Sequence, residues 1–205
     1  MFACQSGNFE LVNFLIQNGA DSHRVFINHR YPGHDNKRYM IHFACESNNF
    51  EIIKLFVDNS NDSDINSLSW DGTPLTIVAR GNCVEGAKLL ISKGANVNIY
   101  SENKDTPILS AAAAGNISML KLLVDSGADV NAVGANNSTP LSLAFEGKYN
   151  ACILYLMQKN ASARFMIDPP LIAAAKQNNM GLLFFMAQNN IDFNQSDVDG
   201  IYFYF

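Results

Sequence analysis

The feature that most constrains the fold of this chain is a repeat within its own sequence. The motif Thr73-Pro74-Leu75 recurs as Thr106-Pro107-Ile108 and as Thr139-Pro140-Leu141, so both intervals are 33 residues. A second motif, Gly94-Ala95-Asn96-Val97-Asn98, recurs after another 33 residues as Gly127-Ala128-Asp129-Val130-Asn131. Because two separate motifs keep one period, the chain is predicted to stack similar small units along an axis.

Each unit has the sequence pattern of two short helices. The threonine can cap a helix N-terminus, and the proline occupies the first helical position, where its missing N–H costs nothing. The first helix is rich in small residues, most clearly at 110–114. The second helix carries large apolar residues at helical spacing, as at 117–124. Gly94 and Gly127 then suit the left-handed residue that ends a helix.

Weaker copies of the motif extend the repeat along the chain. Residues 39–44 and 169–174 stand where two further units would open. We therefore expect a single domain over 1–205, with units at about 1–21, 39–66, 73–98, 106–131, 139–161 and 169–194, an insertion at 22–38 and a partial seventh unit at 197–205. One unit cannot bury its apolar face alone, so about three or more must stack.

These motifs resemble those of the ankyrin-repeat family over essentially the whole chain. The units that begin at Thr73 and Thr106 carry the resemblance best, whereas His42 is the one histidine at the family's histidine position. The resemblance implies an all-α ankyrin-repeat solenoid of stacked helix-turn-helix units, with short hairpin-like loops that project at right angles. It also implies a concave face, made of loops and first helices, that generally binds proteins. It supplies no catalytic residues.

The expected concave face provides the candidate partner-binding residues. First-helix positions hold Phe43, Glu46, Ile77, Arg80, Leu143, Glu146 and Lys176, and the loops add Trp70, Tyr100, Glu102, Asn103, Lys104, Asn136 and Asn137. Apolar residues among charges on one face are the usual composition of an interface. Trp70 precedes Asp71 and Gly72 at an expected loop tip. There it has two open interpretations, an interface hot spot or a side chain packed on the next loop.

The insertion is a basic segment in an acidic chain. It contains Arg24, Phe26, Arg30, Tyr31, Lys37, Arg38 and three of the four histidines, whereas the net charge of the chain is −5. His23, His29, His34 and Asp35 match no standard zinc spacing, so no metal is expected. Four cations without a recognisable fold motif also give no nucleic-acid site. A loop that docks an acidic partner and an ordinary exposed loop both remain open.

Other sequence features favour a binding module over an enzyme. The chain has no glycine-rich phosphate loop, no GxSxG and no HExxH, and we expect no cofactor. Cys4 and Cys45 share one repeat position, and buried, inert thiols are expected. His42 is expected to bond backbone rather than to perform acid–base chemistry. No apolar run approaches the ~20 residues of a membrane span, so we expect no membrane partner. Nothing marks the chain for secretion, so we expect the reducing cytoplasm or nucleus. We also expect a monomeric array.

The expected function is therefore that of a protein-binding scaffold or adaptor. The alternative is the ankyrin-repeat portion of a larger regulatory protein or enzyme, whose activity lies outside this chain. Two observations favour this alternative. The first unit lacks its opening turn, and residues 201–205 are apolar although the terminal units of an array need a polar outer face. An enzyme in its own right has almost no support. Asn131 also resembles the ankyrin site of an oxygen-dependent asparaginyl hydroxylase, although a simple turn role is favoured.

Overall fold

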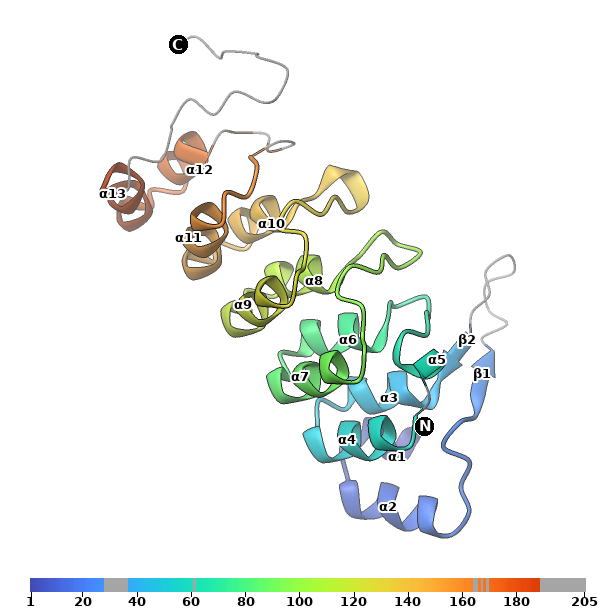
Figure 1. Ribbon diagram of the computed structural model, residues 1–205. Helices are drawn as coiled ribbons and strands as arrows, with labels where there is room; N and C mark the ends of the chain where they lie inside the picture. Colours follow the sequence, from blue (N-terminus) through green and yellow to red (C-terminus); the bar gives the residue numbers. More distant parts are fainter. Residues whose placement is uncertain (28–36, 61, 164–165, 167, 169, 189–205) are drawn as a thin grey trace.

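The computed structural model describes residues 1–27, 37–60, 62–163, 166, 168 and 170–188. In these residues, helices follow one another in pairs that stack along one axis (Figure 1). The pairs are α1 (Phe2–Gln5) and α2 (Phe9–Gln17), α3 (Met40–Glu46) and α4 (Phe50–Asp58), α6 (Pro74–Gly81) and α7 (Val84–Ser92), α8 (Pro107–Ala113) and α9 (Ile117–Asp125), α10 (Pro140–Glu146) and α11 (Asn150–Gln158), and α12 (Pro170–Lys176) and α13 (Met180–Gln188). The expected all-α solenoid is confirmed.

The first helix of each central unit begins at the Thr-Pro motif for the physical reason expected from the sequence. The hydroxyl oxygens of Thr73, Thr106 and Thr139 accept hydrogen bonds from backbone amides three residues later, at 3.2, 3.4 and 3.2 Å. A proline follows each threonine at the start of the helix. These caps satisfy donors that a helix N-terminus otherwise leaves unpaired.

The core runs along the stack as two continuous layers. First helices pack on first helices, and second helices pack on second helices. Small side chains such as Ala79, Ala111 and Ala144 are fully buried in the first layer, which lets neighbouring helices approach closely. The second layer buries large residues: Ile52, Ile53, Leu90, Met119, Leu120, Leu123, Ile153, Leu156 and Leu182.

Asparagine side chains tie the loop of one unit to the next. Asn98 Oδ1 accepts from the backbone amide of Asp129 (3.0 Å), and its Nδ2 donates to the carbonyl oxygen of Gly127 (3.0 Å). Asn66 makes the equivalent pair of bonds one unit earlier. Asn131 lies in a turn, where its backbone amide donates to Asp129 Oδ1 (2.9 Å), which agrees with the turn role that was favoured for it. Its Oδ1 also accepts from the backbone amide of Ser162 (2.7 Å). Its hydroxylation stays a prediction.

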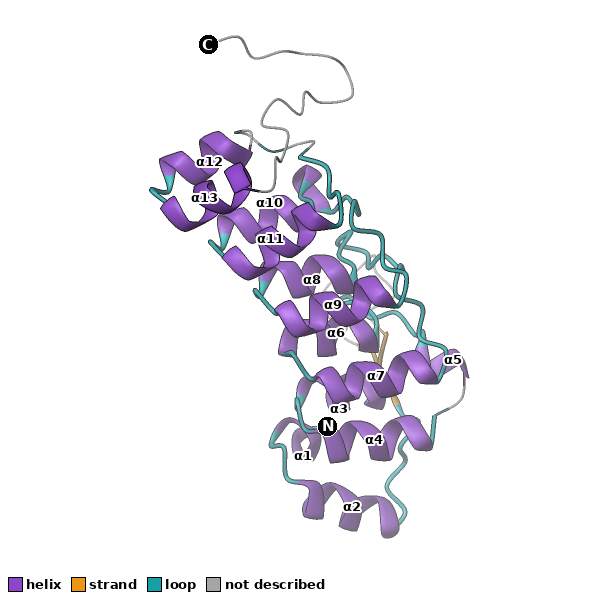
Figure 2. Cartoon of the chain, turned by 60° about the vertical axis from the view of Figure 1, so that its left-hand side comes forward, coloured by secondary structure: helices purple, strands orange, loops and turns teal. Residues whose placement is uncertain are grey.

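Loops and turns occupy opposite edges of the stack. Figure 2 shows the longer connections between units gathered along one edge and the short turns within units along the other. The longer connections include α5 (Asp62–Ile65) and the short 3-10 helix η1 (Ala135–Asn137). These loops and the first helices meet at an angle, and the surface between them is the inner face of the solenoid. It corresponds to the expected concave side.

The flanks of the insertion form a small antiparallel ribbon. Strand β1 (Val25–Ile27) pairs with β2 (Lys37–Tyr39), with Val25 opposite Tyr39. The sequence analysis expected a loop here and missed the ribbon, although Val25, Phe26 and Ile27 favour strand. Residues 28–36, which include His29, Arg30, Tyr31, His34 and Asp35, lie outside the described residues. The expected partial seventh unit at 197–205 lies outside them as well.

Candidate functional site

The inner face contains two adjoining hollows between the loops and the first helices. The first has a volume of about 460 Å³ and lies between the loop at 103–105 and helices α8 and α10. The second has a volume of about 520 Å³ and lies between η1, α10 and α12. Ala135, Ser138 and Leu143 line both hollows, so the two form one continuous groove, which we call the inner groove.

The inner groove combines an apolar floor with a charged rim. Its apolar lining includes Leu109, Ala113, Ala114, Leu143, Phe145, Met166 and Ala173. Its charged lining comprises Arg80, Lys104 and Asp105 in the first hollow and Glu146 and Asp168 in the second. An apolar centre with a polar rim is the usual arrangement of a protein-binding surface.

Arg80 holds the two loops beside the first hollow together. Its Nη1 donates to Asp71 Oδ1 at 2.8 Å, and its Nη2 lies 3.4 Å from Asp105 Oδ2. Asp105 Oδ2 also accepts from the hydroxyl of Ser110 at 2.6 Å. Burial alone would lower the pKa of Arg80, but the hydrogen bonds and charges of the two aspartates raise it above its ordinary value. Arg80 therefore stays charged and organises the rim.

Phe43 and Ile77 do not lie on the exposed surface where the sequence analysis placed them. Their exposed fractions are 4% and 5%. Ile77 is enclosed because α6 packs against both α3 and α8. Phe43 is covered by the ribbon: the Arg38 guanidinium lies 4.4 Å from its ring centroid, and the Phe26 ring meets it edge-on at 5.4 Å. The expectation that these two side chains face a partner is wrong.

Glu46 belongs to the same covered region. It forms an ion pair with Arg38, whose guanidinium also lies 3.8 Å from Asp71 Oδ2. The ribbon therefore occupies the part of the inner face that α3 would otherwise offer. Glu46 is exposed, but its charge is already used within the chain.

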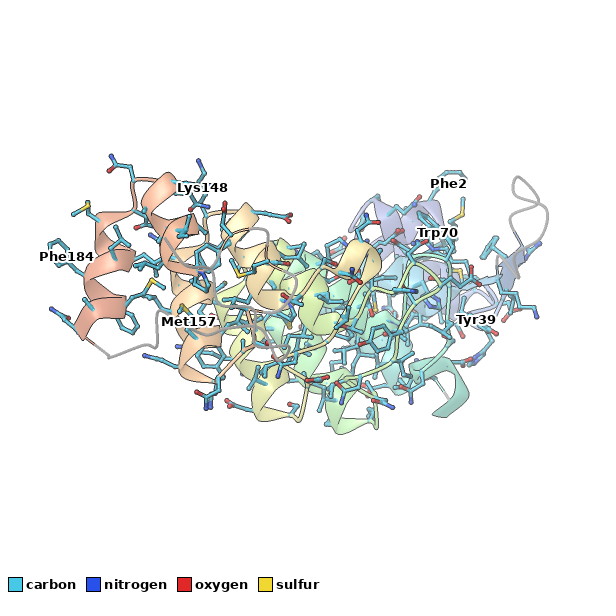
Figure 3. The ribbon with its side chains drawn as sticks, turned by 90° about the horizontal axis from the view of Figure 1, so that it is seen from above. Phe2, Tyr39, Trp70, Lys148, Met157 and Phe184 are labelled. Atoms are coloured by element: carbon cyan, nitrogen blue, oxygen red, sulfur yellow. The ribbon has the colours of Figure 1, made fainter. Side chains whose placement is uncertain are left out.

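Trp70 and Tyr100 are half exposed and half packed. Their exposed fractions are 45% and 44%. The carbonyl oxygen of Trp70 accepts from Asn103 Nδ2 at 3.1 Å, and the hydroxyl oxygen of Tyr100 accepts from the backbone amide of Val133 at 3.2 Å. Figure 3 shows Trp70 near the N-terminal end of the stack, at the opposite end from Phe184. The Tyr100 side chain thus joins two neighbouring loops, whereas Trp70 is bonded to the next loop through its backbone. Both rings still expose surface.

The other predicted residues divide between the groove and its surroundings. Lys104, Asn136, Asn137, Leu143 and Glu146 line the hollows, together with Arg80 and Asn103. Lys176 lies beside the second hollow, where its Nζ contacts Asp168 Oδ1 at 2.6 Å. Glu102 is exposed and lines neither hollow.

The sequence analysis missed several residues of the groove. Ser110 occupies the same repeat position as Ile77 and Leu143, and the period could have indicated it. Asp105 and Leu109 each lie next to a candidate position. Met166 and Gln177 line the second hollow in the region where the 33-residue spacing is broken. Gln177 follows α12 as Ala114 follows α8, whereas no repeat position of an earlier unit predicts Met166.

The buried titratable side chains have structural roles. The backbone amide of Tyr39 donates to His42 Nδ1 (3.2 Å), so His42 Nε2 carries the hydrogen and donates to the carbonyl oxygen of Ser67 (3.1 Å). Burial lowers the pKa of His42 to about 4. The expectation that His42 bonds backbone is confirmed. All four cysteines are buried, and burial raises the pKa of each thiol: Cys4, Cys45, Cys83 and Cys152.

The described residues contain neither a cluster of metal ligands nor a membrane-spanning helix. Nowhere in that part of the chain do three or more histidine, cysteine, aspartate or glutamate side chains gather as a metal site would require. Among the same residues, no helix has the length and apolar character needed to cross a membrane.

Comparisons with known proteins agree with this architecture. The family model described as Ankyrin repeats (3 copies) matches residues 1–101 and 98–167. The crystal structure of the human ASB11 ankyrin repeat domain aligns with a TM-score of 0.77 and 20% identity, and the alignment covers 98% of this chain and 87% of that chain. At this identity the likeness shows the fold alone. No curated protein matches the sequence. Ankyrin repeats generally mediate binding to other proteins, and this chain belongs to the ankyrin-repeat family.

Proposed function

We propose that this chain is a protein-binding scaffold or adaptor that holds its partner in the inner groove. The observation that carries the proposal is the continuity of the two hollows over α8, α10 and α12, with an apolar floor inside a charged rim. Their volumes of about 460 and 520 Å³ suit side chains inserted from a partner. The proposal assigns no catalytic step to the chain.

The ribbon supports a partner site displaced toward the C-terminal half of the inner face. Arg38 and Phe26 cover Phe43, so a partner would have to remove the ribbon to contact α3. The inner groove, by contrast, is open from Arg80 to Gln177. We expect four remaining candidates to contact the partner, with Arg80 organising the rim beside them: Lys104, Asn136, Leu143 and Glu146.

Leu143 is the residue on which this proposal depends most. It lines both hollows and is partly exposed, so its side chain lies at the junction of the groove. A leucine at the centre of an apolar floor excludes water from the surrounding contacts. A charge placed there would be desolvated by any partner that fills the hollows.

The test uses the chain as bait, followed by mass spectrometry of the captured proteins. Leu143→Glu is compared with Leu154→Glu, a partly buried leucine of the same unit on α11. Leu154 occupies the position held by Lys54, Lys88 and Lys121 in earlier second helices, so a charge should be tolerated there. We expect the parent and Leu154→Glu to capture the same proteins, which Leu143→Glu loses. Equal capture by all three would contradict the proposal.

We further propose the setting expected from the sequence, a monomeric array in the reducing cytoplasm or nucleus. All four cysteines are buried and are free thiols, which is compatible with such a compartment. Fractionation of cells that express a tagged chain tests the location. Recovery in an oxidising compartment would contradict it.

A further inference from the structure

Most charged side chains around the inner groove are already paired within the chain. Arg80 is shared by Asp71 and Asp105, and Lys176 is paired with Asp168. Paired charges offer little to a partner, because a new contact must first break an existing one. The specificity of the groove therefore depends on charges that are still free.

Two side chains that line the hollows carry such charges, one of each sign. Lys104 borders the first hollow and Glu146 borders the second, and both are exposed. In the described part of the chain, neither side chain makes a hydrogen bond or an ion pair with another residue. The first hollow thus offers a free cation, and the second offers a free carboxylate.

Gln177, which lines the second hollow, has a buried hydrogen-bond acceptor without a donor. Gln177 Nε2 donates to the carbonyl oxygen of Phe145 at 2.9 Å, which fixes the orientation of the amide. Its Oε1 is buried and has no donor in the described residues. A buried acceptor without a donor is costly, so a partner donor that reached Oε1 through a shift of the Gln177 side chain would remove that cost. Glu146 and Gln177 together favour a cationic side chain with several N–H groups.

The lining of the second hollow suits the stem of such a side chain. Phe145, Met166 and Ala173 provide apolar surface beside Glu146 and Gln177. Lysine and arginine bury their methylene stems on apolar surface while their charged groups contact an acceptor. In the first hollow, Leu109 and Ala113 lie near Lys104, where an acidic side chain of modest length would fit.

The stacking of the units sets the spacing between the two contacts. Packed helices lie about 8–10 Å apart, and an extended chain advances about 3.3 Å per residue. The first hollow is bordered by the loop before α8, and the second lies one unit further along, against α10 and α12. An extended segment therefore needs about three residues to cross the spacing of one unit. It needs about four to reach Glu146, which stands at the far end of α10, about 10 Å along a seven-residue helix.

We propose that the inner groove binds an extended segment of another protein in which an acidic and a basic residue stand about three or four residues apart. The acidic side chain lies beside Lys104, and a lysine or arginine lies beside Glu146 and Gln177. This inference rests on the proposed function of the groove. A nucleic acid would not suit it, since one free cation beside one free carboxylate does not attract a polyanion.

The test is a selection of peptides from a random displayed library against the full chain. The expected peptides combine apolar residues with one acidic and one basic residue at the stated spacing. Lys104→Glu and Glu146→Lys should each weaken a selected peptide on the order of tenfold, because like charges then meet across the interface. The double variant should bind the same peptide with its acidic and basic residues exchanged.

Matched charge reversals on the outer face serve as controls. Glu85→Lys on α7 and Lys121→Glu on α9 change exposed residues far from the groove lining and should leave peptide affinity unchanged. Unchanged melting temperatures show that the groove variants remain folded.

The outcomes separate this inference from the proposed function. If Leu143→Glu abolishes binding but both groove charge reversals do not, the charge assignment is wrong and the groove still binds protein. If the exchanged peptide fails to bind the double variant, the assignment is likewise wrong. If Leu143→Glu leaves the affinity of every selected peptide unchanged, or if the library yields no peptide, two claims are wrong. They are the charge assignment and the proposal that the inner groove binds protein.

Discussion

At the scale of single residues, Tyr149 shows that one repeat position can join a unit to the preceding one through different contacts. The equivalent asparagines, Asn49 and Asn116, each donate from Nδ2 to backbone carbonyl oxygens of the preceding unit. Tyr149 cannot make that bond. Its ring instead lies over the backbone of Gly115 in the preceding unit and of Gly147 in its own unit. The packing of the Tyr149 ring on two glycines thus takes the place of the hydrogen bonds that the asparagines make.

Gly147→Ala should destabilise the chain through this ring. An added Cβ would lie 2.1 Å from Tyr149 Cε2, whereas the φ of Gly147 is −78°, so the backbone itself accepts alanine. We expect a loss of about 1–3 kcal/mol in the free energy of unfolding, measured by urea denaturation. The loss should largely vanish in a Tyr149→Asn background. Stabilisation by Gly147→Ala alone would show that the ring does not constrain this site.

His42 should make the stability of the chain depend on pH. Burial lowers its pKa from the ordinary 6.5 to about 4, so the unfolded state binds a proton first as the pH falls. Stability from this histidine is therefore complete above pH 6.5 and is lost as the pH falls toward 4. We expect a loss of about 2 kcal/mol by pH 5. His42→Leu, which copies Leu109, should be less stable at neutral pH but should lack this slope. Parallel pH profiles for the two proteins would contradict the assignment.

At the scale of elements, the ribbon shows where sequence reasoning reaches its limit. The helices were predictable because their caps and apolar spacing are local properties of the sequence, as Thr106 and Pro107 illustrate. The burial of Phe43 was not predictable in this way. It depends on Arg38 and Phe26, which belong to an insertion with no counterpart in the other units. The lining of the inner groove was not fully predictable either, because Met166 lines it in a region where the 33-residue spacing is broken.

Arg38→Ala should loosen the ribbon from α3. The Arg38 side chain is 13% exposed, lies over the rings of Phe43 and Trp70 at 4.4 and 6.0 Å, and pairs with Glu46. We expect a cost of about 1–2 kcal/mol and faster amide exchange at 25–27 and 37–39. Trp70 is the one tryptophan of the chain, so its fluorescence should also change.

Arg24→Ala serves as the control for the ribbon. Arg24 is exposed, and its guanidinium lies 5.6 Å from the Phe26 ring centroid. Its removal should leave the fluorescence of Trp70 and the exchange of β2 almost unchanged. Equal effects of the two substitutions would mean that Arg38 has no special part in holding the ribbon.

At the scale of the whole molecule, the solenoid is a one-dimensional stack in which each unit depends on its neighbours. Leu11 and Leu15 of α2 are 43% and 41% exposed, whereas the equivalent Ile52 and Phe56 of α4 are 0% and 3% exposed. The difference arises because α2 covers those positions of α4, while no described element covers the same positions of α2. Stability should therefore be distributed unevenly along the stack.

Amide hydrogen exchange should show this distribution. We expect the central pairs α6–α7 and α8–α9 to be the most protected, because units pack against them on both sides. The terminal pairs α1–α2 and α12–α13 should exchange fastest. Exchange in the native state, measured peptide by peptide, gives the order directly. A first pair more protected than α8 and α9 would contradict the nearest-neighbour account.

The most direct test of the central claim is hydrogen exchange of the chain with and without a captured partner. The inner groove predicts new protection at 103–105 and 134–146, which border the two hollows. Helices α9 and α11, on the outer face, should exchange as in the free chain. Protection confined to α9 and α11, with no change at 103–105 or 134–146, would contradict the claim that the inner groove binds the partner.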